Sequence, residues 1–481
     1  MKNTKSILVA SFVFIICFFS SCETTDFGDT NTNPNQPSNA VTSGLLTEAQ
    51  KYLGNNYSTA TVPNLYVQYL SNGDYPDESR YLGFNFSYDT EYQDVLVNLN
   101  EIIKVCTDET TKENASVYGG LNNQIAVSKI LRSYIFVTIA DRWGYAPYTE
   151  ALKGTENLFP KYESVETIYK GSFEEIDEAL SLINSEAGPV GDILFNGNMD
   201  NWKKLANSLK VIMSIRISKQ VPGTTEYAAL QYKKSIENAI SGNNENIIYT
   251  FLEEDSNDNP WQDRFESRKD YCMAETFVNA MIGNGNPETP QDPRLDKYSD
   301  KPVNTPTKHA GGVYGEQNDT SDFSSITSNI IKNSKAPSFL FTYSQMLFAK
   351  AEAVELGWDA GSSEQLTKDA IKASMEQWEV NNTDITTYIN TITYDGLKTI
   401  AYEKWVALFL QGHESWAEWR RYESLGVAPT LKIITNAING NGIPRRHAYP
   451  GTAPSLNKEN YDNAVKAQGK DDLDTNLWWA L

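Results

Sequence analysis

The sequence predicts a mostly α-helical protein, in which a body of helical hairpins is interrupted by a loop-rich region. Three observations lead to this prediction. Between residues 45 and 250, apolar side chains recur at the three- and four-residue spacing of amphipathic helices. Residues 251–335 lose this periodicity and are rich in Pro, Gly, Asn and Asp. Helical periodicity returns over residues 336–439, before a second loop-rich segment at 440–481.

Three segments of the first half carry clear helical patterns. Residues 124–144 have two adjacent apolar stripes, which predicts a helix buried among other helices. Residues 165–184 gather apolar side chains on one face and turn their glutamates, Glu175 among them, mostly away from it. Residues 198–218 form the third helix, for which Asp200 is the expected N-cap.

Short polar connections between such helices suggest stacked hairpins that resemble tetratricopeptide repeats. No 34-residue consensus recurs, so we expect any repeats to be degenerate. In the second half, residues 338–358 and 402–422 have the apolar spacing of further helices.

The N-terminus has the pattern of a secretory signal peptide. Lys2 and Lys5 precede an apolar run at residues 7–19, which is shorter than the roughly 20 residues needed to cross a bilayer. Two serines then lead to Cys22, and this ending resembles the lipobox of bacterial lipoproteins, although Phe19 stands where Leu is usual.

We therefore expect residues 1–21 to be removed and Cys22 to be lipidated. Residues 22–44 would then form a flexible tether, because they contain too few apolar side chains to collapse. An ordinary signal cleavage that leaves Cys22 unmodified is the alternative.

The formal net charge of −21 bears on the possible partners. Nucleic-acid binding depends on neutralising phosphates, so an acidic chain of this kind is not expected to bind nucleic acid. Anionic lipid would also be repelled, and we expect the lipid anchor to provide the membrane attachment. Cys106 and Cys272 lie in mildly apolar surroundings, which favours two buried free thiols over a disulfide.

Sequence motifs of enzymes are missing. The three histidines, His309, His413 and His447, form no His-x-x-x-His pair, and neither a G-x-S-x-G elbow nor a phosphate-binding loop occurs. Carboxylates are plentiful, but no spacing singles out a catalytic pair. We therefore expect no catalytic residues, no enzymatic activity and no cofactor.

One segment has the ligand spacing of a calcium-binding EF-hand loop. Asp255, Asn257, Asn259, Asp263 and Glu266 stand at the required intervals. A proline occupies the position where the turn needs Gly, and the flanks lack the pattern of a helix pair. We predict chance spacing and no metal site, with bound calcium as the alternative.

Aromatic residues are the stronger candidates for ligand binding. They make up 12% of the chain, and some of them lie in loop-like segments outside the helical stripes. Exposed rings stack on sugar rings or peptide side chains, while nearby polar groups fix the orientation of the ligand. The expected stacking rings are Trp261, Tyr271, Tyr75 and Tyr81, and the expected polar contacts are Asp263, Arg268 and Asp74. The alternative is that these rings attach the loops to the helical body.

A series of motifs occurs in fixed order along the whole chain. They are the tether "DTNTNPNQPS", then "DRWGYAPYTEAL", "NWKKLANSLKVIMSIRIS", "NPWQDRF", "DPRL", "SFLFTYSQMLFAKAEAVELGW", "EKWVALFLQGHESWAEWRRY" and "DDLDTNLWW". This series resembles the SusD/RagB family of nutrient-binding outer-membrane lipoproteins of Bacteroidetes, and in particular its SusD-like, starch-binding branch.

The resemblance implies a helical body of four degenerate tetratricopeptide-like pairs and a variable, loop-rich half. It also implies a lipoprotein at the cell surface, anchored through Cys22, which forms a lid on a SusC-like TonB-dependent β-barrel transporter. Such a protein captures oligosaccharides, or peptides in the RagB branch, and passes them to the barrel. The motif tryptophans Trp143, Trp405, Trp416 and Trp419 match scaffold positions, so we expect them in the core. Ligand contacts vary within the family, so no motif assigns them here.

Together these inferences divide the chain into parts. We expect a signal peptide at 1–21, a lipidated tether at 22–44, helical body at 45–250 and 336–439, a ligand-facing variable region at 251–335, and a C-terminal segment packed on the body at 440–481. The first hypothesis for the function is glycan capture for a transporter. The alternatives are a peptide-binding lid and a lipid-anchored scaffold without a small ligand; three or more ring faces exposed along one cleft would exclude the scaffold.

Overall fold

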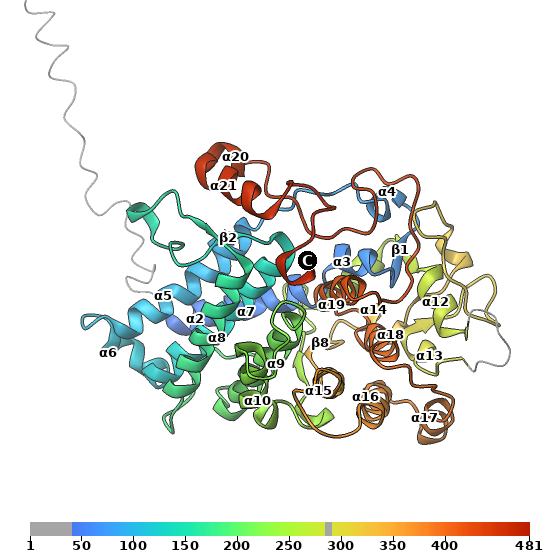
Figure 1. Cartoon of the computed structure of the whole chain (residues 1–481), viewed down its shortest axis with the longest axis horizontal. Coiled ribbons are helices and arrows are strands. Elements are labelled where there is room, and N and C mark those ends of the chain that lie inside the picture. Colours follow the sequence, from blue (N-terminus) through green and yellow to red (C-terminus); the bar gives the residue numbers. More distant parts are fainter. Residues whose placement is uncertain (1–40, 284–290) are drawn as a thin grey trace, which may run out of the picture. The chain divides into compact units, whose positions relative to one another are not determined.

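The computed structural model describes residues 41–283 and 291–481, and residues Thr42–Leu481 form one compact unit (Figure 1). The predicted signal peptide, the expected lipidation site Cys22 and nearly all of the tether lie outside the described residues. Helices dominate this unit, and its strands are short, which confirms the prediction of a mostly α-helical fold.

The helices and strands follow one another without a large sheet. The first half contains α2 Thr42–Tyr52, α3 Thr61–Tyr66, β1 Leu70–Asn72, α4 Pro76–Ser79, α5 Val97–Thr107, α6 Lys112–Ala115, α7 Leu121–Trp143, β2 Ala146–Pro147, β3 Tyr162–Glu163, α8 Val165–Leu182, α9 Met199–Arg216, α10 Tyr227–Ser235 and β4 Ile247–Tyr249. The loop-rich region contains α11 Pro260–Glu266, β5 Tyr271–Met273, α12 Glu275–Met281, α13 Leu295–Tyr298, β6 Ser299–Asp300, β7 Ser325–Ile326 and α14 Ser328–Ile331. The remainder contains β8 Ser338–Phe341, α15 Tyr343–Glu355, α16 Ser363–Gln377, α17 Asn382–Ile389, α18 Leu397–Ala407, α19 Gly412–Ser424, α20 Ala453–Leu456 and α21 Lys458–Gln468.

Neighbouring long helices pack as hairpins. Helix α7 lies against both α5 and α8, α9 lies against α10, and α15 lies against α16 (Figure 1). Helix α7 ends where Gly144 adopts a φ of +87°, a conformation that a residue with a Cβ rarely takes. This stop places Arg142 in the last turn of the helix.

The predicted helices form, with differences at their ends. The expected N-cap Asp200 is wrong: Asn198 caps α9, because its side chain accepts hydrogen bonds from the backbone N–H groups of Asp200 and Asn201. On α8, Glu175 is buried rather than solvated, since its carboxylate accepts a hydrogen bond from Arg132 Nε at 2.8 Å.

The two later segments also differ from single helices. Residues 338–341 form strand β8, which pairs with β4. The helix begins only at Tyr343, where Thr342 is the N-cap and forms a capping box with Gln345. The segment 402–422 is split between α18 and α19, because the chain turns at Leu410, whose φ is +63°. This turn places His413 in the first turn of α19.

Four two-stranded antiparallel sheets are present in the described residues, and two of them join distant parts of the chain. Strand β1 pairs with β5, and β4 pairs with β8. The pairing of β1 with β5 fixes the segment that follows α3 beside the segment that follows α11.

The core contains apolar side chains and a buried ion network. Trp143, Trp405, Trp416 and Trp419 are all buried, as predicted, and Cys106 and Cys272 are buried free thiols. The network joins α7, α9, α15, α18 and α19 through Asp141, Arg216, Glu352, Lys404, Glu414, Glu418 and Arg421. Each cation in it faces at least two carboxylates, as buried charges require.

Candidate functional site

The predicted ligand residues gather near the pairing of β1 with β5. Tyr75 is 50% exposed, and the guanidinium of Arg268 lies 4.8 Å from the centre of its ring. Arg268 is itself held by Asp270, with Nη2 and Oδ2 2.6 Å apart. Tyr271 is half-buried and donates a hydrogen bond to Glu78 Oε2 at 3.1 Å.

Asp74 and Asp263 are both exposed. Partial burial and the neighbouring Asp258 raise the pKa of the Asp263 carboxyl above its ordinary value. Tyr75, Tyr271, Asp74, Asp263 and Arg268 therefore stay predicted ligand contacts.

Two of the predicted stacking rings are buried, and the structure corrects the expectation for both. Trp261 is 1% exposed, because Asn259 caps α11 and the helix directs the indole into the core. The guanidinium of Arg264 lies over this ring, 4.9 Å from its centre. Tyr81 is also 1% exposed and packs edge to face against Tyr66. Neither ring presents a face to a ligand.

The segment with calcium-like spacing folds in another way. Residues Pro260–Glu266 are helical, and the Asn259 side chain accepts from the N–H of Trp261 and donates to the carbonyl of Ala336. Within residues 41–283 and 291–481, no group of three or more His, Cys, Asp or Glu side chains is placed to hold a metal ion.

Beside the predicted residues lies a polar pocket with a volume of about 270 Å³. Two π-helical turns, Leu53–Tyr57 and Glu91–Leu96, contribute to its wall, and such turns are frequent at functional sites. We call it the Arg142 pocket. Its lining residues are Tyr52, Asn55, Asn56, Tyr57, Ala60, Thr61, Val62, Pro63, Phe86, Ser87, Thr90, Glu91, Arg142, Arg264, His413 and His447.

Aromatic rings and imidazoles form much of this wall. His447 is 1% exposed; it stacks on Trp416 with the ring centres 5.0 Å apart and lies 4.3 Å from the ring of Phe86. Tyr57 meets His413 edge to face at 5.4 Å. The backbone N–H of His447 donates to the carbonyl of Arg142 at 2.7 Å, which fixes the imidazole beside the end of α7.

Several polar atoms of this wall lack a hydrogen-bond partner among the described residues. They are the hydroxyl of Tyr57, Nε of Arg142, Nη1 of Arg264, Nδ1 of His413 and both ring nitrogens of His447. A buried donor or acceptor without a partner costs about 1–3 kcal/mol. Such atoms are uncommon in folded proteins. Each of these is itself closed to solvent, so a ligand in the hollow would pair with them only after a small shift of the wall.

Burial and nearby cations set the protonation of this wall. Burial lowers the pKa of His413 and His447 well below the ordinary value, and Arg142 and Arg420 lower it further. Both imidazoles are therefore neutral at pH 7, so each has one nitrogen that donates and one that accepts. Burial also raises the pKa of Tyr57 well above its ordinary value, which keeps its hydroxyl a donor.

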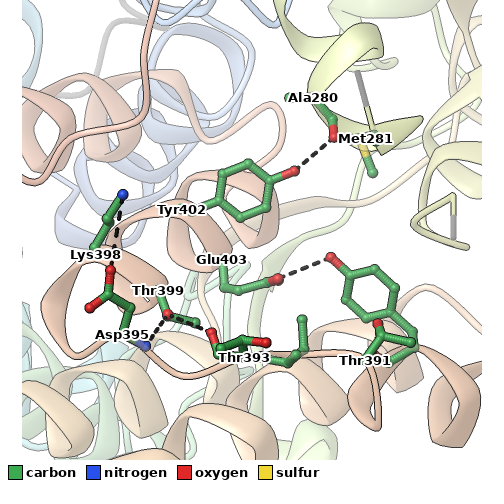
Figure 2. A pocket seen from close by; sticks show the side chains of 12 residues that line it. Ala280, Met281, Thr391, Thr393, Asp395, Lys398, Thr399, Tyr402 and Glu403 are labelled. Carbon is green, nitrogen blue, oxygen red and sulfur yellow. Dashed lines mark hydrogen bonds and ion pairs between the residues drawn. The ribbon is translucent and has the colours of Figure 1, made fainter. Parts of the chain in front are cut away.

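A second hollow lies between α12, α17 and α18, and is shown in Figure 2. It has a volume of about 580 Å³ and continues, past Ala280, Lys398 and Tyr402, into a neighbouring hollow of about 540 Å³. We call the pair the Tyr402 groove.

The polar groups of the Tyr402 groove bind one another. Tyr402 donates to the carbonyl of Ala280 at 3.0 Å, and Tyr388 donates to Glu403 Oε1 at 3.0 Å (Figure 2). Lys398 lies 4.0 Å from Asp395. The groove is larger than the Arg142 pocket. Because its polar groups already have partners, a polar ligand would gain fewer new hydrogen bonds there.

Comparison with known proteins assigns the chain to a family. The profile of the SusD-like family, described as "starch-binding associating with outer membrane", matches residues 34–450. The chain belongs to this family. No curated protein matches the sequence.

Solved structures show the same SusD-like fold. A chitin-binding protein superposes with a TM-score of 0.76 at 23% identity, over 92% of this chain and 100% of its own. A SusD homologue from Bacteroides fragilis gives 0.78 at 19% identity, over the same shares of both chains. A chitin-binding SusD homologue from Flavobacterium johnsoniae gives 0.73 at 19% identity, covering 92% of this chain and 97% of its own.

In this SusD-like chain, the sequence gives little sign of the Arg142 pocket. Arg142 lies in a motif interpreted as scaffold. His413 and His447 form no zinc-binding pair, and no other sequence pattern marks them as site residues. Arg264 lies in the segment that we singled out for its aromatic rings. Among the described residues, no helix combines the length and the apolar character needed to cross a membrane.

Proposed function

We propose that this protein binds glycans at the outer membrane and is not an enzyme. In this proposal it captures oligosaccharides and delivers them to a SusC-like TonB-dependent transporter. Membership of a family described as starch-binding and associated with the outer membrane supports the proposal. The similarity to structures of chitin-binding proteins supports it as well.

The observation that carries the proposal is the composition of the Arg142 pocket. Rings such as Phe86 offer apolar faces. Tyr57, Arg142 and His447 line the same small space, and their unpartnered atoms would bond a ligand after a small shift of the wall. Sugars present apolar ring faces and many hydroxyl groups, so they can satisfy both kinds of contact. Tyr75 and Tyr271, on the neighbouring surface, would extend the contact to further sugar units.

The remaining parts of the proposal concern attachment and organisation. Lipidation of Cys22 would hold the protein at the outer membrane, and the residues between Cys22 and helix α2 would act as a tether, since 42–44, predicted as part of it, begin that helix. Residues 45–250 and 336–439 would form the body that docks on the transporter and most of the pocket wall, 251–335 would add Arg264 and the surface around Tyr271, and 440–481 would pack on the body and supply His447.

A peptide-binding role of the RagB kind is the second candidate. The net charge of −21 favours it, because an acidic surface attracts cationic peptides. A scaffold without a ligand is the third. Tyr75, Phe84 and Phe159 are exposed loop aromatics, but none of them lines the pocket or the groove described above, so a binding measurement has to separate the hypotheses.

The first test is calorimetry on the soluble protein that starts at Glu23. It would be titrated with plant, fungal and mucin oligosaccharides, chitin and starch fragments among them, and with a tryptic peptide mixture. We expect saturable heat from one glycan class. Binding heat from peptides alone would favour the peptide-binding role. No binding heat from any ligand would contradict binding by the isolated protein.

Paired Tyr→Phe variants connect the binding to the pocket. Tyr57→Phe removes an unpartnered pocket hydroxyl, and we expect glycan affinity to fall about 5–10-fold, the effect of one hydrogen bond. Tyr66→Phe is the matched control, because its hydroxyl is also buried and unpartnered among the described residues but does not line the pocket. Equal affinities for the two variants would place the glycan elsewhere.

A further inference from the structure

The charges of the Arg142 pocket do not balance. Its charged lining residues are Arg142, Arg264 and Glu91. Glu91 is already engaged, because its Oε1 lies 2.5 Å from Nη1 of Arg142. With both histidines neutral, the pocket keeps one positive charge in excess, although the whole chain carries −21.

Arg264 is the origin of this excess. Its guanidinium has no carboxylate within 4.0 Å in the described part of the chain, and it makes no hydrogen bond there. Arg216, Arg294 and Arg421, by contrast, each meet two or more carboxylates. Burial lowers the pKa of Arg264, and Tyr271 and Asp263 offset this only in part. The Trp261 ring gives the guanidinium a cation–π contact but no negative charge, so an anion would still lower the cost of burying this cation.

The unpartnered atoms of the pocket suit an acceptor-rich group. Nε of Arg142, Nη1 of Arg264 and the Tyr57 hydroxyl can all donate once a small shift of the wall opens them to a ligand. Each neutral imidazole adds one more nitrogen that donates. A carboxylate accepts about four hydrogen bonds and forms its strongest ones with guanidinium groups.

The size of the pocket limits the ligand to one small unit. Its volume of about 270 Å³ lies just below the usual range of ligand sites, about 300 to 1,000 Å³. The rings of Phe86 and Tyr52 line the same space and can cover the apolar face of a sugar ring.

We propose that the Arg142 pocket binds the carboxylate of an acidic sugar unit, such as a uronic acid, within the captured glycan. This inference rests on the proposed glycan-binding function and specifies its substrate class. A neutral sugar would leave the Arg264 charge uncompensated. A cationic peptide would meet Arg142 and Arg264, two like charges.

The test compares oligosaccharides that differ only in the acidic group. The soluble protein would be titrated with trigalacturonate, with its carboxyl-reduced form, which is neutral trigalactose of the same linkage, and with sulfated trigalactose. We expect trigalacturonate to bind at least about 10-fold more tightly than the neutral trimer. Equal or stronger binding of the sulfated trimer would overturn the choice of carboxylate over sulfate.

Two arginine variants test whether the preference for the acidic trimer originates in the Arg142 pocket. In Arg264→Gln we expect the preference for the acidic trimer to disappear, while affinity for the neutral trimer changes little. Arg445→Gln is the matched control, because Arg445 is also half-buried and lies over a tryptophan ring, 5.3 Å from the centre of Trp419, but it pairs with Glu423 and does not line the pocket. Preference that survives in Arg264→Gln but is lost in Arg445→Gln would overturn the assignment to the pocket.

The outcomes separate this inference from the proposed function. Tight binding of neutral glycans without preference for an acidic group overturns the inference alone. Failure of every glycan, acidic and neutral, overturns both. A final arm uses a short peptide with a free or an amidated C-terminus: if only the free carboxylate binds and no uronate does, the pocket is a peptide-carboxylate site and the sugar assignment is wrong.

Discussion

The Arg142 pocket and the Tyr402 groove differ in two separate properties: the volume of the hollow, and whether the polar atoms of its wall already have hydrogen-bond partners. Each of the two hollows of the groove has about twice the volume of the pocket, but Tyr402, Tyr388 and Lys398 already have partners within the groove. The pocket is smaller and contains buried polar atoms without partners in the described residues. Polar atoms lose their water when they are buried, so a hollow whose atoms remain unpartnered has more to gain from a ligand. The pocket is therefore the better candidate site.

The largest expected effect tests the charge pair inside the pocket. Glu91→Gln removes the only carboxylate within 4.0 Å of Arg142 in the described residues and leaves a mostly buried cation unpaired. We expect a loss of about 3 kcal/mol in the free energy of unfolding, measured by urea denaturation.

The groove supplies the matched control for this variant. Asp395→Asn removes the partner of Lys398, but both side chains are about three-quarters exposed and 4.0 Å apart. An exposed pair of this kind contributes at most about 1 kcal/mol, and we expect a change below 0.5 kcal/mol. Similar losses in the two variants would contradict the electrostatic difference between the two hollows.

The second prediction concerns the pH dependence of stability, which should originate in the pocket. His413 and His447 have lowered pKa values in the folded state because of burial and nearby Arg142 and Arg420. Below pH 6.5 the unfolded chain therefore binds protons that the folded chain does not. Stability is complete above pH 6.5 and falls as the pH drops, by about 1.4 kcal/mol per pH unit for each proton.

Urea denaturation between pH 7 and pH 5 at constant ionic strength measures this slope. The charged groups that act on these rings include Arg142, Arg420 and, for His447, Arg446. The double variant His413→Gln/His447→Phe should flatten the slope within this window. An unchanged slope in the variant would mean that other groups cause the pH dependence.

Local sequence patterns predict the long helices well but not their ends. The apolar side chains of α7, α8 and α9 recur at helical spacing, because α8 packs one face against its neighbours while α7 and α9 are buried on most sides. The cap Asn198 and the break at Leu410 depend on single hydrogen bonds and one backbone dihedral, which periodicity does not record. Strand β8 escapes prediction because it pairs with β4, about 90 residues earlier in the chain.

The candidate site is harder to predict than the helix ends, because it depends on contacts between residues that are far apart in the sequence. Arg142 and His447 are about 300 residues apart, and a backbone hydrogen bond between them exists only in the folded chain. The aromatic composition of the 261–271 segment drew attention to the neighbourhood of Arg264, which lines the proposed pocket. It did not show that Trp261 points into the core, because the direction of a side chain on α11 depends on tertiary packing.

The smallest expected effect tests the groove directly. Tyr402→Phe removes the hydrogen bond from the tyrosine hydroxyl to the carbonyl of Ala280, and we expect a loss of about 1 kcal/mol in the free energy of unfolding. Glycan affinity, measured by calorimetry, should remain equal to that of the wild-type protein, because the groove is not the binding site in this proposal. The opposite pattern, weaker glycan binding with unchanged stability, would mean that the Tyr402 hydroxyl serves the ligand rather than the fold. The groove would then replace the Arg142 pocket as the candidate site, in spite of its internal hydrogen bonds.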